Sequence, residues 1–126
     1  MKKDMRNISY WNKRGITYGD LDDVKSSRTA YKIIEMIRPL GLNSGSWILD
    51  AGCGGGYITK IIRDRIRHSN VVGVDLSRKM IEVASVEESP GLKFIAVDFF
   101  RIISEIYSFF NLVIMSLFLH HLTELV

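Results

Sequence analysis

Residues 48–56, Ile-Leu-Asp-Ala-Gly-Cys-Gly-Gly-Gly, join an apolar run to an acid and then to a turn that is dense in glycine. The residues that follow, 57–62, begin a helical pattern of apolar positions. In an open α/β sheet, a strand, a glycine turn and a helix in this order hold a nucleotide-like ligand against the helix N-terminus. Glycine adopts positive φ and lets a ligand approach the main chain with no Cβ in between. The stretch therefore predicts a ligand site on an α/β sheet.

The spacing of the glycines separates two kinds of nucleotide turn. A dinucleotide turn needs G-x-G-x-x-G, and its third glycine would fall where this chain has Tyr57. The chain instead has G-x-G-x-G at Gly52, Gly54 and Gly56, preceded by Asp50. This D-x-G-x-G-x-G pattern resembles motif I of the class I S-adenosylmethionine (SAM)-dependent methyltransferases. The resemblance implies that SAM is the cofactor, that the turn faces its methionine end, and that Asp50 supports the turn and helps hold the SAM ammonium.

A second acid ends the next apolar run. Residues 71–75, Val-Val-Gly-Val-Asp, are typical of a buried parallel strand because the run is continuous rather than alternating. Asp75 follows the glycine turn by roughly 20 residues, where an acid accepts hydrogen bonds from ribose hydroxyls. The resemblance adds Leu76 to the same cofactor site. Ser77 is a good cap for the following helix, so we expect Asp75 to stand free for a ligand.

A third strand, within residues 93–97, leads to Asp98 and Phe99. The resemblance implies that Asp98 accepts a hydrogen bond from the adenine amino group. It also implies that the next backbone N–H, that of Phe99, and an aromatic side chain help fix the adenine ring. The alternative is structural, because Asp-Phe-Phe before a helix is also a good cap arrangement.

Residues 110–122 resemble the fourth strand and following loop of the ubiquinone/menaquinone-methyltransferase-like, small-molecule branch of the family. That branch usually has an acid where this chain has Asn111. The resemblance implies a small-molecule acceptor. His120 and His121 follow this strand, where a histidine could remove a proton from a hydroxyl or enol acceptor near neutral pH. The alternative is that the two histidines cap or pack the next helix.

The N-terminus carries a further match. Residues 10–18, Tyr-Trp-Asn-Lys-Arg-Gly-Ile-Thr-Tyr, resemble the aromatic entry segment of these enzymes, with Gly15 in place of the usual alanine. The resemblance implies that Tyr18 contacts the methionine end of SAM. The alternative is that the aromatic side chains of this segment only pack the first helix.

Strand patterns alternate with helix patterns, which predicts an α/β fold: a Rossmann-like parallel sheet with helices on both faces. We expect one domain, with an N-terminal cover segment and helix at residues 1–45 and a SAM-binding core at 46–126. The expected helices are one capped by Ser26 or Ser27 and those at residues 57–67, 77–88 and 101–107; the expected strands are 47–50, 71–75, 93–97 and 110–116.

The resemblance implies a sheet order of 3-2-1-4-5-7-6, of which about four strands of seven can be placed in this chain. We therefore expect a truncated, incomplete form of the fold. An apolar fourth strand at the sheet edge would leave backbone groups unpaired, which favours self-association through that strand.

The composition of the chain argues against nucleic acid and membrane as partners. The 126 residues carry a net charge of +3, and the basic side chains Lys60, Arg63 and Arg67 share one helix face, which a solvated surface explains better than a nucleic-acid site. The N-terminus has no signal-peptide pattern, and the apolar stretch at 106–122 is too short and too interrupted to span a membrane.

Cysteine usage points to a reducing compartment. Cys53 is the single cysteine, so no internal disulfide can form, and we expect a cytoplasmic protein. The chain has no C-x-x-C or His/Cys cluster, so we expect no metal site. Cys53 lies within the glycine turn, where its small size, rather than nucleophilic chemistry, accounts for it.

We therefore predict a SAM-dependent methyltransferase that acts on a small-molecule acceptor. The alternative is a non-catalytic or truncated SAM-binding half-domain that requires a partner chain. A nicotinamide-dependent oxidoreductase on the same sheet is disfavoured by Tyr57 and by the matches around Asp98 and the histidine pair.

Overall fold

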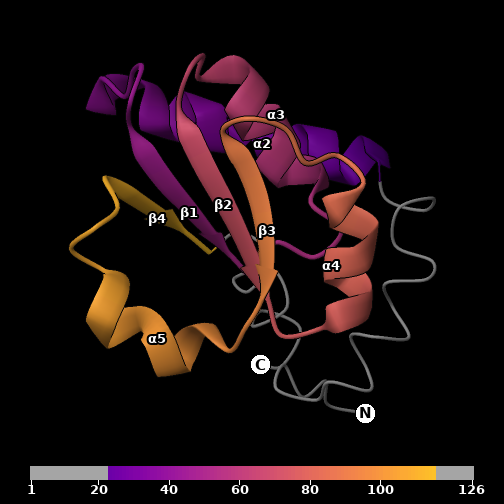
Figure 1. Ribbon diagram of the computed structural model, residues 1–126. Coiled ribbons are helices and arrows are strands. Elements are labelled where there is room, and N and C mark those ends of the chain that lie inside the picture. Colours follow the sequence, from indigo (N-terminus) through magenta and orange to yellow (C-terminus); the bar gives the residue numbers. More distant parts are fainter. Residues whose placement is uncertain (1–22, 116–126) are drawn as a thin grey trace, which may run out of the picture.

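The computed structural model describes residues 23–115, with side chains described from residue 28 onward. Strand and helix alternate along these residues, as predicted (Figure 1). In chain order the elements are α2 (Asp23–Ile37), η1 (Arg38–Leu40), β1 (Trp47–Ala51), α3 (Tyr57–Arg65), β2 (Asn70–Asp75), α4 (Arg78–Ser85), β3 (Leu92–Ala96), α5 (Phe99–Ile106) and β4 (Leu112–Ile114).

The four strands form one parallel sheet in the order β3-β2-β1-β4. Ile48 of β1 lies opposite Val71 of β2 on one side and Leu112 of β4 on the other. The parallel arrangement and the order of these four strands confirm the predicted topology. Among the described residues, β4 pairs only with β1, so its outer edge has no partner strand in this part of the chain.

Helices cover both faces of the sheet, as predicted. Neighbouring side chains of a strand point to opposite faces, so Ile48 joins a core with α2, α3 and α4, and Leu49 joins a core with α5. Figure 1 shows α2 and α3 behind the strands. The first core is formed by buried side chains of three helices and all four strands, among them Ala30, Ile34, Ile58, Ile62, Ile81 and Phe94.

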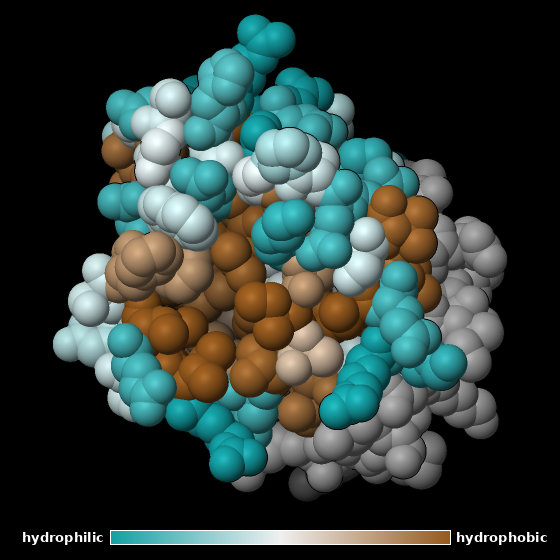
Figure 2. All heavy atoms as spheres, in the orientation of Figure 1, coloured by the Kyte–Doolittle hydropathy of each residue, from teal (hydrophilic) through white to brown (hydrophobic). Residues whose placement is uncertain are grey.

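The second core is smaller, because α5 is the only described helix on its face. Its buried side chains are Leu49, Ala51, Val74 and Phe99. Ile95 of β3 remains 51% exposed. Apolar side chains gather over the centre of this face in Figure 2. This side of the sheet is therefore only partly covered by the described residues. None of the described helices has the length and apolar character needed to cross a bilayer.

The ring of Phe94 packs into space that two glycines leave open. A Cβ built on Gly73 would lie 2.7 Å from Cδ1 of Phe94 and 2.9 Å from Sγ of Cys53. A Cβ on Gly56 would lie 2.8 Å from Cε1 of the same ring. Distances this short force atoms to shift, so β3 sits against the glycine turn only because both positions lack a side chain.

Asn111 joins the start of β4 to the start of β1. Its side-chain Oδ1 accepts a hydrogen bond from the backbone N–H of Trp47 at 2.7 Å, and its own N–H donates to the carbonyl of Trp47 at 2.8 Å. An aspartate at this position would present the same acceptor. The departure from the family pattern therefore keeps an acceptor at this position.

Two sequence expectations about element ends were wrong. Ser26 and Ser27 do not precede the first described helix, because α2 begins at Asp23 and both residues lie inside it. Within the described residues, the fourth strand is Leu112–Ile114, shorter than the predicted 110–116, because the turn after α5 ends at residue 109 and the backbone bends at Asn111, beside the Trp47 contact.

The close packing of Phe94 yields a test of the fold. We expect Gly73→Ala to lower the free energy of unfolding by about 1–3 kcal/mol, because the added methyl group overpacks the space beside Phe94 and Cys53. Urea unfolding followed by circular dichroism measures the loss. The double variant Gly73→Ala/Phe94→Leu should be less destabilised than the sum of the two single variants. Strict additivity would show that the two positions do not share this space.

Candidate functional site

The glycine turn, residues 52–56, lies between the end of β1 and the start of α3. The N–H groups of Gly52 and Cys53 both donate to the carbonyl of Val74, at 2.8 and 3.0 Å. Gly52, Gly54 and Gly56 have φ values of 76°, 57° and 83°, a region that favours glycine. Main-chain bonds to β2 therefore fix the turn, and its backbone is free of side-chain bulk at these three positions.

Asp75 fastens this turn to the end of β2. Its Oδ2 accepts a hydrogen bond from the N–H of Gly54 at 2.9 Å, and its Oδ1 accepts one from the N–H of Ser77 at 2.9 Å. Burial raises the pKa of Asp75, while hydrogen bonds from the backbone of Ser77, Gly54 and Leu76 oppose the rise. The carboxylate thus holds the turn after β1 and the backbone at residues 76–77 at one point.

This arrangement corrects one expectation. Ser77 does cap α4, because its hydroxyl accepts a hydrogen bond from the N–H of Met80 at 3.2 Å. Asp75 nevertheless does not stand free, since both of its oxygens already bond to backbone. Each carboxylate oxygen carries two lone pairs, so Asp75 keeps the capacity to accept further hydrogen bonds from a ligand.

Asp50 lies at the end of β1 and is fully buried. Its Oδ2 accepts a hydrogen bond from the hydroxyl of Thr59 at 2.7 Å, and its Oδ1 has no hydrogen-bond partner among the described residues. Burial raises the pKa of Asp50 to about 7; the Thr59 hydrogen bond lowers it, and the charge of Asp75 raises it. A buried carboxylate oxygen without a partner is costly, so a donor or a cation at this point would stabilise the ionised carboxylate.

Thr59 is a residue that the sequence analysis missed. It lies on α3, and its side chain is fully buried on the same core-facing side as Ile58 and Ile62. The signal was present as a polar residue at a core-facing position of an amphipathic helix, where a hydroxyl needs an internal acceptor. Cys53 is also buried, and burial raises the pKa of its thiol, which agrees with the prediction that it is not a nucleophile.

Asp98 caps α5. Its Oδ1 accepts a hydrogen bond from the N–H of Phe100 at 3.0 Å, which confirms the structural alternative for this acid. The side chain of Phe99 is buried in the second core, so it does not offer its ring to a ligand. Phe100, the next residue, is 57% exposed and is the aromatic side chain at this point that faces outward. The predicted contact of Asp98 with adenine stays a prediction.

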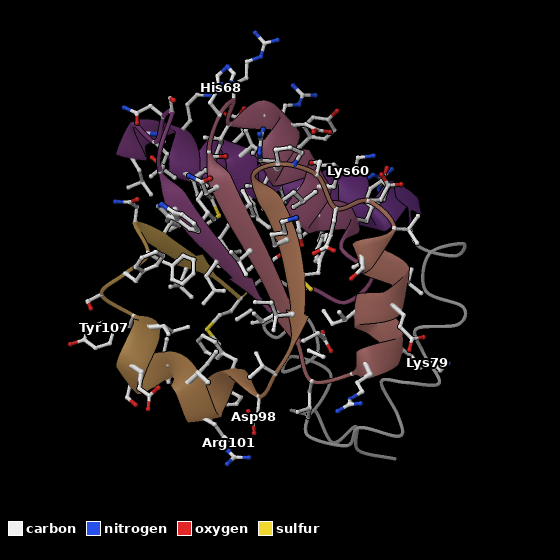
Figure 3. All side chains as sticks on the ribbon, viewed as in Figure 1. Lys60, His68, Lys79, Asp98, Arg101 and Tyr107 are labelled. Carbon is white, nitrogen blue, oxygen red and sulfur yellow. The ribbon has the colours of Figure 1, made fainter. Side chains whose placement is uncertain are left out.

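The parallel register brings these groups to one edge of the sheet. Val74 of β2 pairs with Ala51 of β1, and Asp75 pairs with Ala96 of β3, so the turn, Asp75 and Asp98 follow neighbouring strand ends. Leu76 follows Asp75 directly and is half-buried. In Figure 3, Asp98 lies at this end of the sheet and His68 lies at the opposite end. His68 therefore takes no part in the candidate site.

Three predicted site residues, Tyr18, His120 and His121, lie outside the described residues. Within residues 28–115, where side chains are described, no group of three or more histidine, cysteine or acidic side chains is arranged to hold a metal ion.

Residues 48–126 match the protein family described as methyltransferase domain, which is more than half of the chain. The chain belongs to this methyltransferase domain family. A malonyl-[acyl-carrier protein] O-methyltransferase of Priestia megaterium is 34% identical over 74 residues, which cover 59% of this chain and 27% of that protein. The chain spans about a quarter or less of the length of the curated relatives that it matches.

Solved structures share the fold. A SAM-dependent methyltransferase from Anabaena variabilis superposes with a TM-score of 0.61 at 24% identity, over 84% of this chain and 47% of that one. A putative methyltransferase of Haloferax volcanii, solved in complex with the Trm112 methyltransferase activator, has a TM-score of 0.54 at 21% identity, over 76% of this chain and 40% of that one. These likenesses confirm the predicted Rossmann-like α/β fold of the methyltransferases.

The two roles of the acids at the sheet edge can be separated by substitution. We expect Asp75→Asn to lower the free energy of unfolding by about 1–3 kcal/mol, because an amide cannot accept both backbone N–H bonds. Asp98→Asn is the matched control, since asparagine caps a helix about as well as aspartate. Urea unfolding of both variants measures the difference. Equal losses would show that the Asp75 bridge adds nothing beyond a helix cap.

Proposed function

We propose that this chain binds SAM at the carboxyl edge of its sheet and takes part in methyl transfer to a small-molecule acceptor. The observation that carries the proposal is the D-x-G-x-G-x-G turn, fastened by Asp75, in a chain of the methyltransferase domain family. The other groups at the edge fit the same ligand.

The residues present suit each part of the cofactor. The unpartnered oxygen of Asp50 is an acceptor suited to the ammonium group, and the N-terminus of α3 at Gly56 suits the carboxylate. Asp75 is the acceptor for the ribose hydroxyls, and we assign Leu76, Asp98 and the backbone of Phe99 to the adenine side. The bare backbone at Gly52, Gly54 and Gly56 lets the ligand approach closely.

SAM supplies a methyl group that is already activated by its sulfonium. The protein's task is alignment, so the turn and the two acids would hold the cofactor in one position and exclude water around it. Tyr18 is assigned to the methionine end in the same proposal.

The acceptor class is suggested by the relatives, which are named as O-methyltransferases of malonyl-[acyl-carrier protein]. We propose a malonyl thioester as the first acceptor to test. A carboxylate is ionised near neutral pH and can attack the methyl group without a base. A hydroxyl acceptor needs a base, and His120 or His121 would then fill that role.

A second candidate is a SAM-binding half-domain that needs a partner chain. The observation that favours it is the outer edge of β4, which has no partner strand among the described residues. The partner would be a second copy of this chain or a distinct protein that pairs with that edge. We also assign a cytoplasmic location, because the single thiol is buried and unpaired.

Cofactor binding is tested by isothermal titration of the full chain with SAM and with its demethylated product, S-adenosylhomocysteine. We expect saturable binding of both, and at least about a tenfold loss of affinity in Asp75→Ala, because charge-assisted bonds to the ribose are lost. Asp64→Ala, which removes an exposed acid from the opposite end of α3, should bind like the wild type. Circular dichroism confirms that each variant is folded.

Transfer is tested with radiolabelled SAM and a malonyl thioester. Labelled ester supports the methyltransferase, and binding without turnover favours the half-domain, for which light scattering should show dimers or larger species. Absence of saturable binding in folded protein would contradict both candidates.

A further inference from the structure

The hydroxyl of Thr59 is directed into the core for a specific contact. Thr59 lies on α3, and its side chain is fully buried. Its hydroxyl donates a hydrogen bond to Oδ2 of Asp50 at 2.7 Å. The other buried side chains of this helix are Ile58 and Ile62. A hydroxyl among apolar side chains is tolerated only when it is hydrogen-bonded. The pair therefore forms a unit, in which Oδ2 of Asp50 is hydrogen-bonded and Oδ1 has no partner in the part of the chain that the structure describes.

Where side chains are described, from residue 28 to 115, the surroundings of Asp50 supply no positive charge. Burial, the Thr59 hydroxyl on α3 and the Asp75 carboxylate on β2 are the influences on its ionisation within the described residues, and none of them is a cation. The neighbouring thiol of Cys53 is itself kept protonated by burial and by the charges of Asp50 and Asp75. On the β4 side, Asp50 lies opposite the apolar Ile114. A ligand that brings an ammonium group would supply the missing cation.

We propose that Thr59 is a positioning residue that fixes Asp50 with one oxygen reserved for the cofactor ammonium, and that cofactor binding removes a proton from Asp50. The proton leaves the carboxyl group for the solvent, and a lone pair on Oδ1 then accepts an N–H of the ammonium. This inference rests on the proposed function, and it adds that cofactor affinity is coupled to pH through Asp50, over a pH range set by Thr59, which touches no ligand itself.

The direction of the coupling follows from the ionisation of Asp50. Its pKa in the free protein is about 7, so much of it is protonated near neutral pH. A bound cation favours the carboxylate, so affinity should rise with pH, at most about tenfold per pH unit. Loss of the Thr59 hydroxyl removes an interaction that lowers the pKa of Asp50, so Thr59→Val should move this rise to higher pH.

Titration calorimetry with S-adenosylhomocysteine tests the coupling between about pH 5.5 and 7.5, below the usual range of α-amino groups. Two buffers of different ionisation enthalpy report the protons released. We expect up to one proton released at the acidic end and less at the alkaline end. Thr59→Val should bind about tenfold more weakly at neutral pH. Thr59→Ser, which keeps the hydroxyl, should behave like the wild type.

Asp50→Asn is the control for other titrating groups. Its affinity should no longer change with pH, although all the histidines remain. The proposal is overturned if the affinity of this variant still changes with pH. It is also overturned if the affinity of Thr59→Val rises over the same pH range as that of the wild type.

Unfolding of the free protein gives a readout that needs no cofactor. The folded-state pKa of Asp50 lies above its ordinary value of 3.8, so its ionisation costs stability, and the urea midpoint should fall as pH rises from about 4 to 7. The fall should extend to higher pH in Thr59→Val and be restored in Thr59→Ser. If the wild type binds no S-adenosylhomocysteine, the proposed function fails. Separately, if the urea midpoint of Thr59→Val falls over the same pH range as that of the wild type, the link between Thr59 and Asp50 is refuted.

Discussion

The carboxylate of Asp75 is the point at which the two central strands and the helices that follow them are held together. It accepts from the backbone of Gly54 in the turn after β1 and from that of Ser77 at the start of α4. The carbonyl of the preceding residue, Val74, accepts two more N–H groups from the turn. A glycine-dense loop has large conformational freedom in the unfolded chain, and it is ordered here only because the end of β2 supplies these acceptors.

Burial raises the pKa of both acids at this edge, and the two acids differ in the hydrogen bonds that oppose this rise. Three backbone N–H groups oppose the effect of burial on the pKa of Asp75, whereas one hydroxyl does so for Asp50. Their like charges also disfavour simultaneous ionisation. Asp75 is therefore part of the scaffold, and in our proposal Asp50 is the acid whose charge depends on what binds next to it.

Much of the architecture was predictable because parallel strands in a covered sheet are continuous apolar runs, and because acids and glycines mark their ends. The strand order, the two-sided helical cover and the cap at Ser77 all agreed with the sequence. The contacts that define the site were harder to foresee. The bond between Gly54 and Asp75 joins residues 21 positions apart, and it depends on the register of β1 against β2, which no local pattern contains.

Local preferences also misled. Ser26 and Ser27 are good caps by residue type, but α2 extends past them to Asp23. The aromatic pair after Asp98 does not say which ring enters the core, and the structure places Phe99 inside and Phe100 outside. The roles of Tyr18, His120 and His121 stay predictions, as does the division of the chain at residue 45.

The two hydrogen bonds between Asn111 and Trp47 have a consequence for the synthesis of the protein on the ribosome. They join residues 64 positions apart, and β1 has its second neighbour only when β4 is in place. During translation, one edge of β1 therefore stays without a partner strand until nearly the whole described segment has been made. Non-local closure of this kind slows folding and leaves nascent chains open to wrong pairing, so this protein should depend on chaperones more than a helical domain of the same size.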